Sequence, residues 1–199
     1  QPKGPDTVTL LWPETASLSY RIPDYDVSLA FRPNDFTQVN TAINQAMVTR
    51  ALDLLDLQPT DQVLELFCGL GNFTLPIAKR AGHVTGIEGE AGLVQRAREN
   101  AVRNGISNVE FHAVDLSEDP TEQDWMKQAY DRILLDPPRI GAEEMVKYIG
   151  ALGAERIVYV SCHPGSLARD AGVLVKTRGS KLQAAGVMDL CRNTSRKPC

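Results

Sequence analysis

The sequence predicts an α/β fold: a doubly wound, Rossmann-like parallel sheet covered by helices on both faces. Short runs that are apolar on both faces alternate with helical stretches from residue 62 onward, the pattern of strands buried on both sides. The first run leads through glycines into a helix, and the second ends in an acid about 20 residues further on, as in nucleotide-binding βαβ units. With 199 residues, 43% of them hydrophobic, the chain can bury one continuous core.

The first elements differ from the rest. Residues 7–30 hold three short β-prone runs separated by prolines and Asp24, which predicts a small antiparallel appendage. We therefore interpret 1–30 as the remnant of a small β subdomain and 31–199 as the main domain. From 40 to 57 apolar residues recur at helical spacing, which predicts one amphipathic helix closed by Pro59.

The alternating elements follow in order. Helices are expected from about 73, over about 90–104 and from about 164. Strands are expected at 63–67, 83–87, 109–113, 132–135 and 157–160.

Composition excludes several classes of protein. No apolar run approaches the roughly 18 residues of a membrane span, and Gln1 begins no signal peptide, so we expect a cytoplasmic protein. The four cysteines have no C-x-x-C spacing, which favours reduced thiols and no metal. A net charge of −4 argues against a broad basic surface. Any surface that binds nucleic acid must therefore be small, or lie outside this chain.

The glycine turn predicts an adenosine pocket. Gly69 and Gly71 allow a ligand to approach the backbone, and Glu88 is placed to bind a ribose. A dinucleotide site needs a third glycine where this chain has Thr74, so S-adenosylmethionine fits better than NAD. Asp115, after the third strand, would face the adenine. The alternatives are a plain tight turn for the glycines and a helix cap or turn for Asp115.

Two further strand ends indicate chemistry. Asp136 is followed by two prolines, which stiffen its loop. Cys162 ends the next strand, where His163 or the amino end of the following helix could favour a thiolate. Addition of a thiolate to carbon 6 of a pyrimidine makes carbon 5 nucleophilic toward a methyl donor, and a base must then remove the carbon-5 proton. The alternatives are a plain turn at Asp136 and an inert buried thiol at Cys162.

Four motifs resemble, in order and spacing, the catalytic domain of the RNA uracil-5-methyltransferases, most closely the bacterial members that methylate a uridine in 23S ribosomal RNA. They are F-R-P-N-D-F-T-Q-V-N at 31–40, L-F-C-G-L-G-N-F at 66–73, L-D-P-P-R at 135–139 and I-V-Y-V-S-C-H-P at 157–164. The resemblance implies a methyltransferase domain over 31–199 that binds ribosomal RNA, with transfer RNA as the rival substrate. We expect a monomer.

The resemblance also implies roles for single residues. Cys162 would be the nucleophile. The contact of Gln38 with S-adenosylmethionine is implied by the resemblance alone, since the pattern of its segment predicts a loop that leads into a helix cap. The residues implied to contact S-adenosylmethionine are Gln38, Phe67, Asn72, Glu88, Asp115 and Asp136.

The sequence departs from the family at three places. His163 stands where the family has asparagine. No glutamate follows Met188, so we expect the proton-abstracting base and the last antiparallel strand to be missing. The alternative function is therefore a protein that binds the cofactor but turns over poorly. The OB-like RNA-binding domain and the cysteine-bound iron–sulfur cluster of related members are expected in a part absent from this chain. A weaker alternative is an NAD-dependent oxidoreductase.

Overall fold

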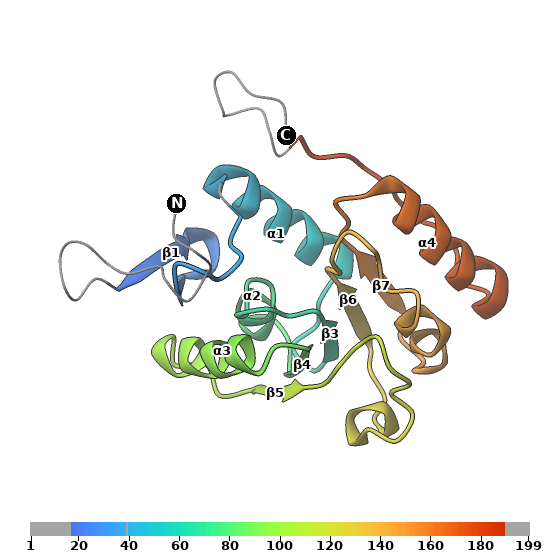
Figure 1. Ribbon diagram of the computed structural model, residues 1–199, viewed down its shortest axis with the longest axis horizontal. Coiled ribbons are helices and arrows are strands. Elements are labelled where there is room, and N and C mark those ends of the chain that lie inside the picture. Colours follow the sequence, from blue (N-terminus) through green and yellow to red (C-terminus); the bar gives the residue numbers. More distant parts are fainter. Residues whose placement is uncertain (1–16, 39, 190–199) are drawn as a thin grey trace, which may run out of the picture.

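A computed structural model describes residues 17–38 and 40–189 of the chain. Its elements form a two-stranded hairpin and a five-stranded sheet with helices on both sides (Figure 1). The predicted strand at 7–12, the tail after residue 190, and Cys191 and Cys199 lie outside the described residues.

The large sheet is parallel throughout and has the order β5-β4-β3-β6-β7. The chain therefore winds outward from β3 in one direction, returns to its other side, and winds outward again, which confirms the doubly wound prediction. The point where the direction reverses lies between β3 and β6, the usual place for a ligand in such folds. The strands are β3 (Gln62–Leu66), β4 (His83–Glu88), β5 (Val109–Ala113), β6 (Arg132–Leu135) and β7 (Arg156–Tyr159).

The predicted helices are confirmed. The side chain of Asn40 accepts a hydrogen bond from the Ile43 nitrogen at 3.3 Å and so caps the first of them. The helices are α1 (Thr41–Leu55), α2 (Thr74–Ala78), α3 (Ala91–Arg103) and α4 (Pro164–Arg178). The connections around β6 hold 3₁₀ turns that the sequence pattern did not indicate: η3 (Asp124–Lys127), η4 (Met145–Lys147) and η5 (Ile149–Ala151).

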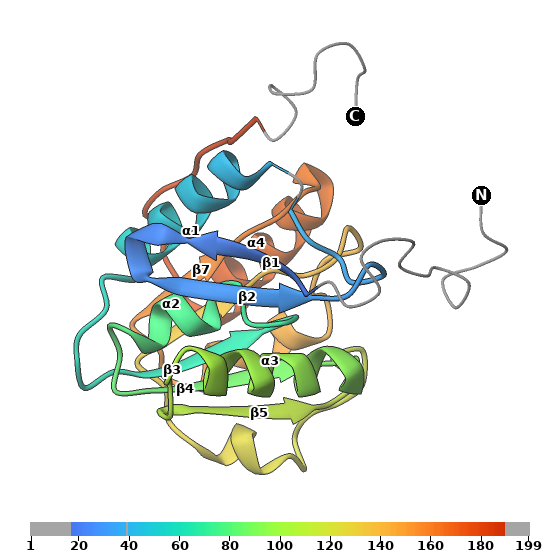
Figure 2. The ribbon, with the colours of Figure 1, turned by 90° about the vertical axis from the view of Figure 1, so that its left-hand side faces the viewer.

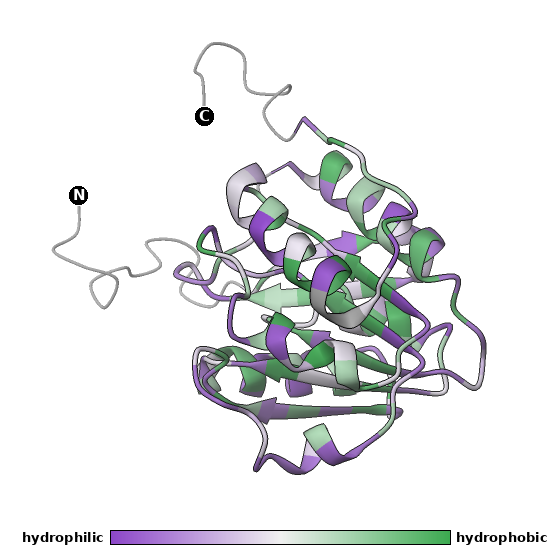
Figure 3. Cartoon of the chain, turned by 90° about the vertical axis from the view of Figure 1, so that its right-hand side faces the viewer, coloured by the Kyte–Doolittle hydropathy of each residue, from purple (hydrophilic) through white to green (hydrophobic). Residues whose placement is uncertain are grey.

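Two apolar cores lie on the two faces of the sheet. On one face α1, α2, α3 and the hairpin pack over Val63 and Val84, and Figure 2 shows these elements in front of the sheet. On the other face the 3₁₀ turns and α4 bury Leu64, Leu66 and Trp125. In Figure 3 the inner strands are mostly hydrophobic, whereas polar residues alternate along the outer helices. The alternation of β3 side chains between two cores explains why Val63, Leu64 and Leu66 are apolar although they point to opposite faces of the sheet.

The hairpin belongs to the first core. It consists of β1 (Leu18–Ile22), a 3₁₀ turn η2 (Pro23–Tyr25) and β2 (Val27–Phe31), and its strands are antiparallel as predicted. Ile22, Val27 and Leu29 are fully buried. Thus the hairpin packs as an integral layer, and its origin in a larger β subdomain stays a prediction.

No helix within 17–38 and 40–189 is both long enough and apolar enough to cross a membrane.

Candidate active site at the carboxyl edge of the sheet

The parallel sheet brings the predicted residues of five strands to one edge. Because all five strands run the same way, their carboxyl ends meet there, and each strand is hydrogen-bonded to the next in the order given above. The residues at or just past these ends are Phe67 after β3, Glu88 at the end of β4, Asp115 after β5, Asp136 after β6 and Cys162 after β7.

The turn after β3 has an unusual backbone, and the N–H groups of Cys68, Gly69 and Gly71 are all hydrogen-bonded within the protein. Phe67, Gly69 and Gly71 have φ values of 65°, 56° and 99°, in the left-handed region. For Phe67 this conformation is strained, which is characteristic of functional sites. Glu88 braces the turn, because its carboxylate accepts hydrogen bonds from the nitrogens of Gly69 and Glu90, each at 3.0 Å.

A buried carboxyl group lies beneath this turn. Glu65 in β3 is fully buried, and neither of its oxygens has a hydrogen-bond partner among the described residues, nor does the nearby Thr74 hydroxyl. Burial raises the pKa of Glu65 to about 8, and the neighbouring charges of Asp136 and Glu88 add to the rise. A buried polar group without a protein partner can be satisfied by an ordered water or by a polar ligand. An amino acid moiety with an ammonium group would be such a ligand.

Glu65 was missed in the sequence analysis. Its signal is a single acid inside the otherwise apolar run V-L-E-L, since an acid in a strand that is apolar on both faces must be buried. Cys68, three residues later, has its thiol buried, and burial together with Glu65 and Glu88 raises its pKa, so it is a packing residue and a poor nucleophile.

Asp136 lies at the switch point between β3 and β6. Its backbone nitrogen donates to the Leu66 carbonyl oxygen at 3.3 Å, which carries the sheet pairing up to the site. Burial raises the pKa of Asp136 to about 6. The two prolines then lead into a turn closed by a 2.8 Å hydrogen bond from the Gly141 nitrogen to the Pro138 oxygen.

Cys162 is exposed at the apex of a tight turn. The hydroxyl of Ser161 bridges the turn, because it lies 3.1 Å from the nitrogen and 3.0 Å from the oxygen of His163. The His163 ring then caps α4 by accepting a hydrogen bond at Nδ1 from the Ser166 nitrogen at 3.2 Å. The His163 ring is therefore engaged as a helix cap, and α4 begins two residues after Cys162.

Three other predicted residues have weaker geometric support. Asp115 is exposed, and its Oδ1 accepts hydrogen bonds from the nitrogen and hydroxyl of Ser117 at 2.9 and 2.7 Å, which lower its pKa. It therefore forms a turn, and its contact with adenine stays a prediction. Gln38 is half-buried in the loop between β2 and α1, and Asn72 is half-buried directly after Gly71. Their cofactor contacts also stay predictions.

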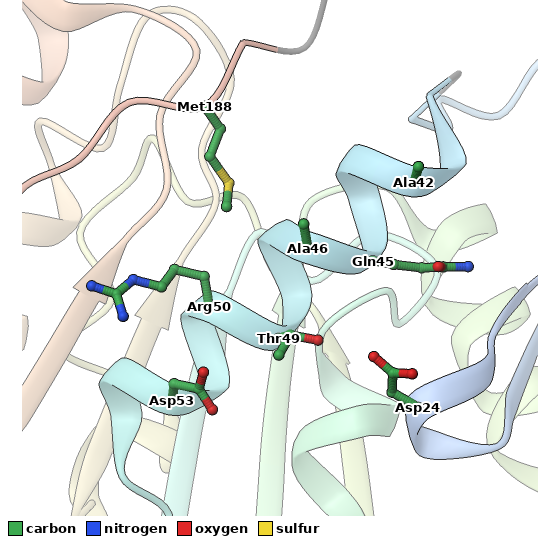
Figure 4. A pocket seen from close by; sticks show the side chains of 8 residues that line it. All are labelled: Asp24, Ala42, Gln45, Ala46, Thr49, Arg50, Asp53 and Met188. Atoms are coloured by element: carbon green, nitrogen blue, oxygen red, sulfur yellow. The ribbon is translucent and has the colours of Figure 1, made fainter. Parts of the chain in front are cut away.

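A separate hollow lies on the outer face of α1 (Figure 4). Its volume is 520 Å³, and none of the predicted site residues lines it. In the described part of the chain, no three histidine, cysteine or acidic side chains are grouped to hold a metal ion.

Comparison with known proteins gives a consistent result. Residues 14–196 match the family described as tRNA (Uracil-5-)-methyltransferase. The chain is 56% identical over 195 residues to the 23S rRNA (uracil(1939)-C(5))-methyltransferase RlmD of Xanthomonas campestris, which covers 98% of this chain and 44% of that protein. The protein of the same name from Alcanivorax borkumensis is 56% identical over 197 residues, with the same coverage. The chain thus spans less than half the length of these relatives.

A solved structure is similar to the chain in both fold and sequence. It is the tRNA (uracil-54, C5)-methyltransferase of Pyrococcus abyssi in complex with S-adenosyl-L-homocysteine. Its TM-score is 0.68 at 28% identity, over 79% of this chain and 37% of that one.

Proposed function

Since this chain belongs to the tRNA (uracil-5-)-methyltransferase family, we propose that it methylates carbon 5 of a uridine in 23S ribosomal RNA, with S-adenosylmethionine as the methyl donor. The observation that carries the proposal is an exposed thiol, Cys162, at the sheet edge that holds the glycine turn. Identity of 56% to proteins named for this reaction supports the choice of ribosomal RNA.

The groups around β3 would hold the cofactor. The backbone of Gly69 and Gly71 would admit its methionine part, Glu88 would bind the ribose, and Glu65 would meet the ammonium group. Gln38, Phe67, Asn72, Asp115 and Asp136 would complete the contacts. When bound, S-adenosylmethionine supplies an electrophilic methyl group and leaves as S-adenosylhomocysteine.

The protein's own part in the reaction begins at Cys162. Its thiolate would form a bond to carbon 6 of the uracil ring, and the electron pair of the 5,6 double bond would move to give an enolate that is nucleophilic at carbon 5. After carbon 5 has taken the methyl group, a base removes the carbon-5 proton, the bond from Sγ to carbon 6 breaks, and the double bond is restored. The uridine has to leave its stack to reach the thiol, which favours a loop target.

The last step decides whether the enzyme turns over. The resemblance to the family implies that a glutamate serves as the proton-abstracting base. Addition and methyl transfer need only Cys162 and the donor. The methylated covalent adduct forms before the proton is removed, and it is the species that the following assay detects.

Incubation with an RNA loop and S-adenosylmethionine, followed by denaturing electrophoresis, tests the proposal. A protein–RNA band is expected with the unmodified chain and not with Cys162→Ala, whereas Cys68→Ala, which removes the buried thiol, should keep it. If the band persists in Cys162→Ala, the mechanism is wrong. Calorimetry adds an independent check, since binding of NAD but not of S-adenosylhomocysteine would favour an oxidoreductase.

Transfer RNA is the second candidate substrate. The family description and the Pyrococcus abyssi enzyme, both named for tRNA, favour it. The same electrophoretic assay separates the two, because a 23S ribosomal RNA loop and a transfer RNA loop compared at equal concentration should differ in the yield of adduct. Faster adduct formation with transfer RNA would reverse our choice.

A further inference from the structure

We infer that Tyr20 and Asn44 are positioning residues of the cofactor site, which hold the carboxamide of Asn72 so that it presents an N–H donor to the cofactor. The inference rests on the proposed function, because the contact between Asn72 and the cofactor is part of that proposal. It adds two residues, from α1 and from the hairpin, that neither motif nor resemblance indicated.

The first contact is a reciprocal amide pair. Nδ2 of Asn44 donates to Oδ1 of Asn72 at 2.9 Å, and Nδ2 of Asn72 donates to Oδ1 of Asn44 at 3.0 Å. Asn44 is 2% exposed on the inner face of α1, so its side chain has little freedom to move. The pair fixes the plane of the Asn72 amide relative to the glycine turn that precedes it.

The second contact fixes which group of that amide remains available. The Tyr20 hydroxyl donates to the same Oδ1 of Asn72 at 2.9 Å. A carboxamide oxygen has two lone pairs, and both are now used. Of the two Nδ2 hydrogens, one is bonded to Asn44. Among the described residues, the remaining N–H is the one group of the Asn72 amide without a partner. It suits an acceptor, such as the carboxylate of the cofactor's methionine part.

Tyr20 can act as a fixed donor because the hairpin is held firmly. Asn100 in α3 and Asn104 at the C-cap of that helix lie one turn apart. Each side chain bonds to both the nitrogen and the oxygen of one residue in β2, Ala30 and Ser28 respectively. Asn100 also donates to the Leu70 carbonyl oxygen at 3.1 Å, inside the glycine turn. Figure 2 shows the hairpin lying between α1 and α3, in front of α2. The turn is thus supported from three elements at once.

Calorimetric titration of the full chain with S-adenosylhomocysteine tests the inference. Tyr20→Phe keeps the ring and removes the hydroxyl, which frees the Asn72 amide to rotate, so we expect affinity to fall by about three- to tenfold, the effect of one neutral hydrogen bond. Asn44→Ala should have a larger effect. In an Asn72→Ala background, Tyr20→Phe should cause no further loss, because Tyr20 acts through Asn72.

The chain offers a matched control in Tyr25. This tyrosine is also in the hairpin and 6% exposed, but its hydroxyl has no hydrogen-bond partner among the described residues. Tyr25→Phe should leave the affinity unchanged, and urea unfolding without ligand should show whether either variant loosens the fold.

The outcomes are distinguishable. An unchanged affinity in Tyr20→Phe, or an equal loss in the presence and absence of the Asn72 side chain, would overturn the positioning role and leave the proposed function intact. A merely structural role predicts the second result. No binding of S-adenosylhomocysteine by the unmodified chain would instead overturn the proposed function itself.

Discussion

Ser166 in α4 donates its hydroxyl to the carbonyl oxygen of Arg139 at 3.1 Å, which joins the turn that carries Cys162 to the loop that carries Asp136. Ser166 is buried, and its backbone nitrogen is the donor that His163 accepts. Cys162 and Asp136, which follow neighbouring strands, are therefore connected through Ser166 as well as by sheet pairing. This explains how two loops at a sheet edge hold a fixed relative position.

Asp170 strengthens this connection and gives the first prediction. Its fully buried carboxylate accepts hydrogen bonds from the Ala142 nitrogen at 2.7 Å, the Tyr159 hydroxyl at 2.6 Å and Nε of Arg169 at 2.8 Å. Asp170→Ala leaves these donors unpaired, so the free energy of unfolding in urea should fall by about 3 kcal/mol. Tyr159→Phe should cost about 1 kcal/mol.

The Asp170 network also has a predictable pH dependence. Burial raises the pKa of Asp170, but the hydrogen bonds from Arg169, Tyr159 and Ala142 outweigh it and the pKa is lowered. The stabilisation by this network is therefore fully present at pH values above about 3.9, the pKa of an aspartate in the unfolded chain. It is lost as the pH falls through the lower pKa that Asp170 has in the folded protein. Asp53→Ala, an exposed change on α1, is the control and should stay within about 0.5 kcal/mol of the unmodified chain.

Glu65 gives the second prediction, with the opposite sign. Because its pKa is raised to about 8, mainly by burial, the folded protein holds a proton that the unfolded chain releases near pH 4.3. Stability should therefore decline as pH rises from about 4.3 to 8, by at most about 1.4 kcal/mol per pH unit. Glu65→Gln removes this dependence. In urea unfolding, the free energy of unfolding of the variant should therefore rise relative to that of the unmodified chain as the pH increases from 5 to 8. Parallel pH profiles for the two proteins would contradict the assignment.

The sequence was sufficient to predict the strands and main helices, because each is apolar on the faces that the two cores bury. It also placed Cys162 and Asp136 at the same edge, since parallel strands share a carboxyl end. The 3₁₀ turns around β6 were not predicted, because segments of three or four residues carry no periodicity. The partners of Asn72 were also beyond reach, since Tyr20 and Asn44 lie 52 and 28 residues away in the chain.

The asparagines of α3 give the third prediction. Asn100→Ala removes the donors and acceptor that serve Ala30 and Leu70, so the free energy of unfolding should fall by about 2 kcal/mol or more. Asn104→Ala, which releases only the Ser28 end of the strand and an intrahelical contact, should cost less. Gln95 lies on the exposed face of the same helix, and within residues 17–38 and 40–189 its side chain bonds to Glu99 alone, so Gln95→Ala should change stability by less than about 0.5 kcal/mol. Equal losses in all three variants would mean that the strand contacts contribute little.

His163 gives the fourth prediction, which tests whether the departure from the family's asparagine matters. The ring caps the helix by accepting a hydrogen bond from the Ser166 N–H, and asparagine is among the residues most favoured at this position. His163→Asn should therefore keep both the stability of the protein and its rate of adduct formation with RNA. His163→Ala removes the acceptor, so stability should fall by about 1 kcal/mol, and the adduct should form more slowly because the turn that presents Cys162 loses one of its supports. A loss of adduct in His163→Asn as large as in His163→Ala would show instead that the imidazole itself takes part in the chemistry, since capping alone cannot distinguish the two side chains.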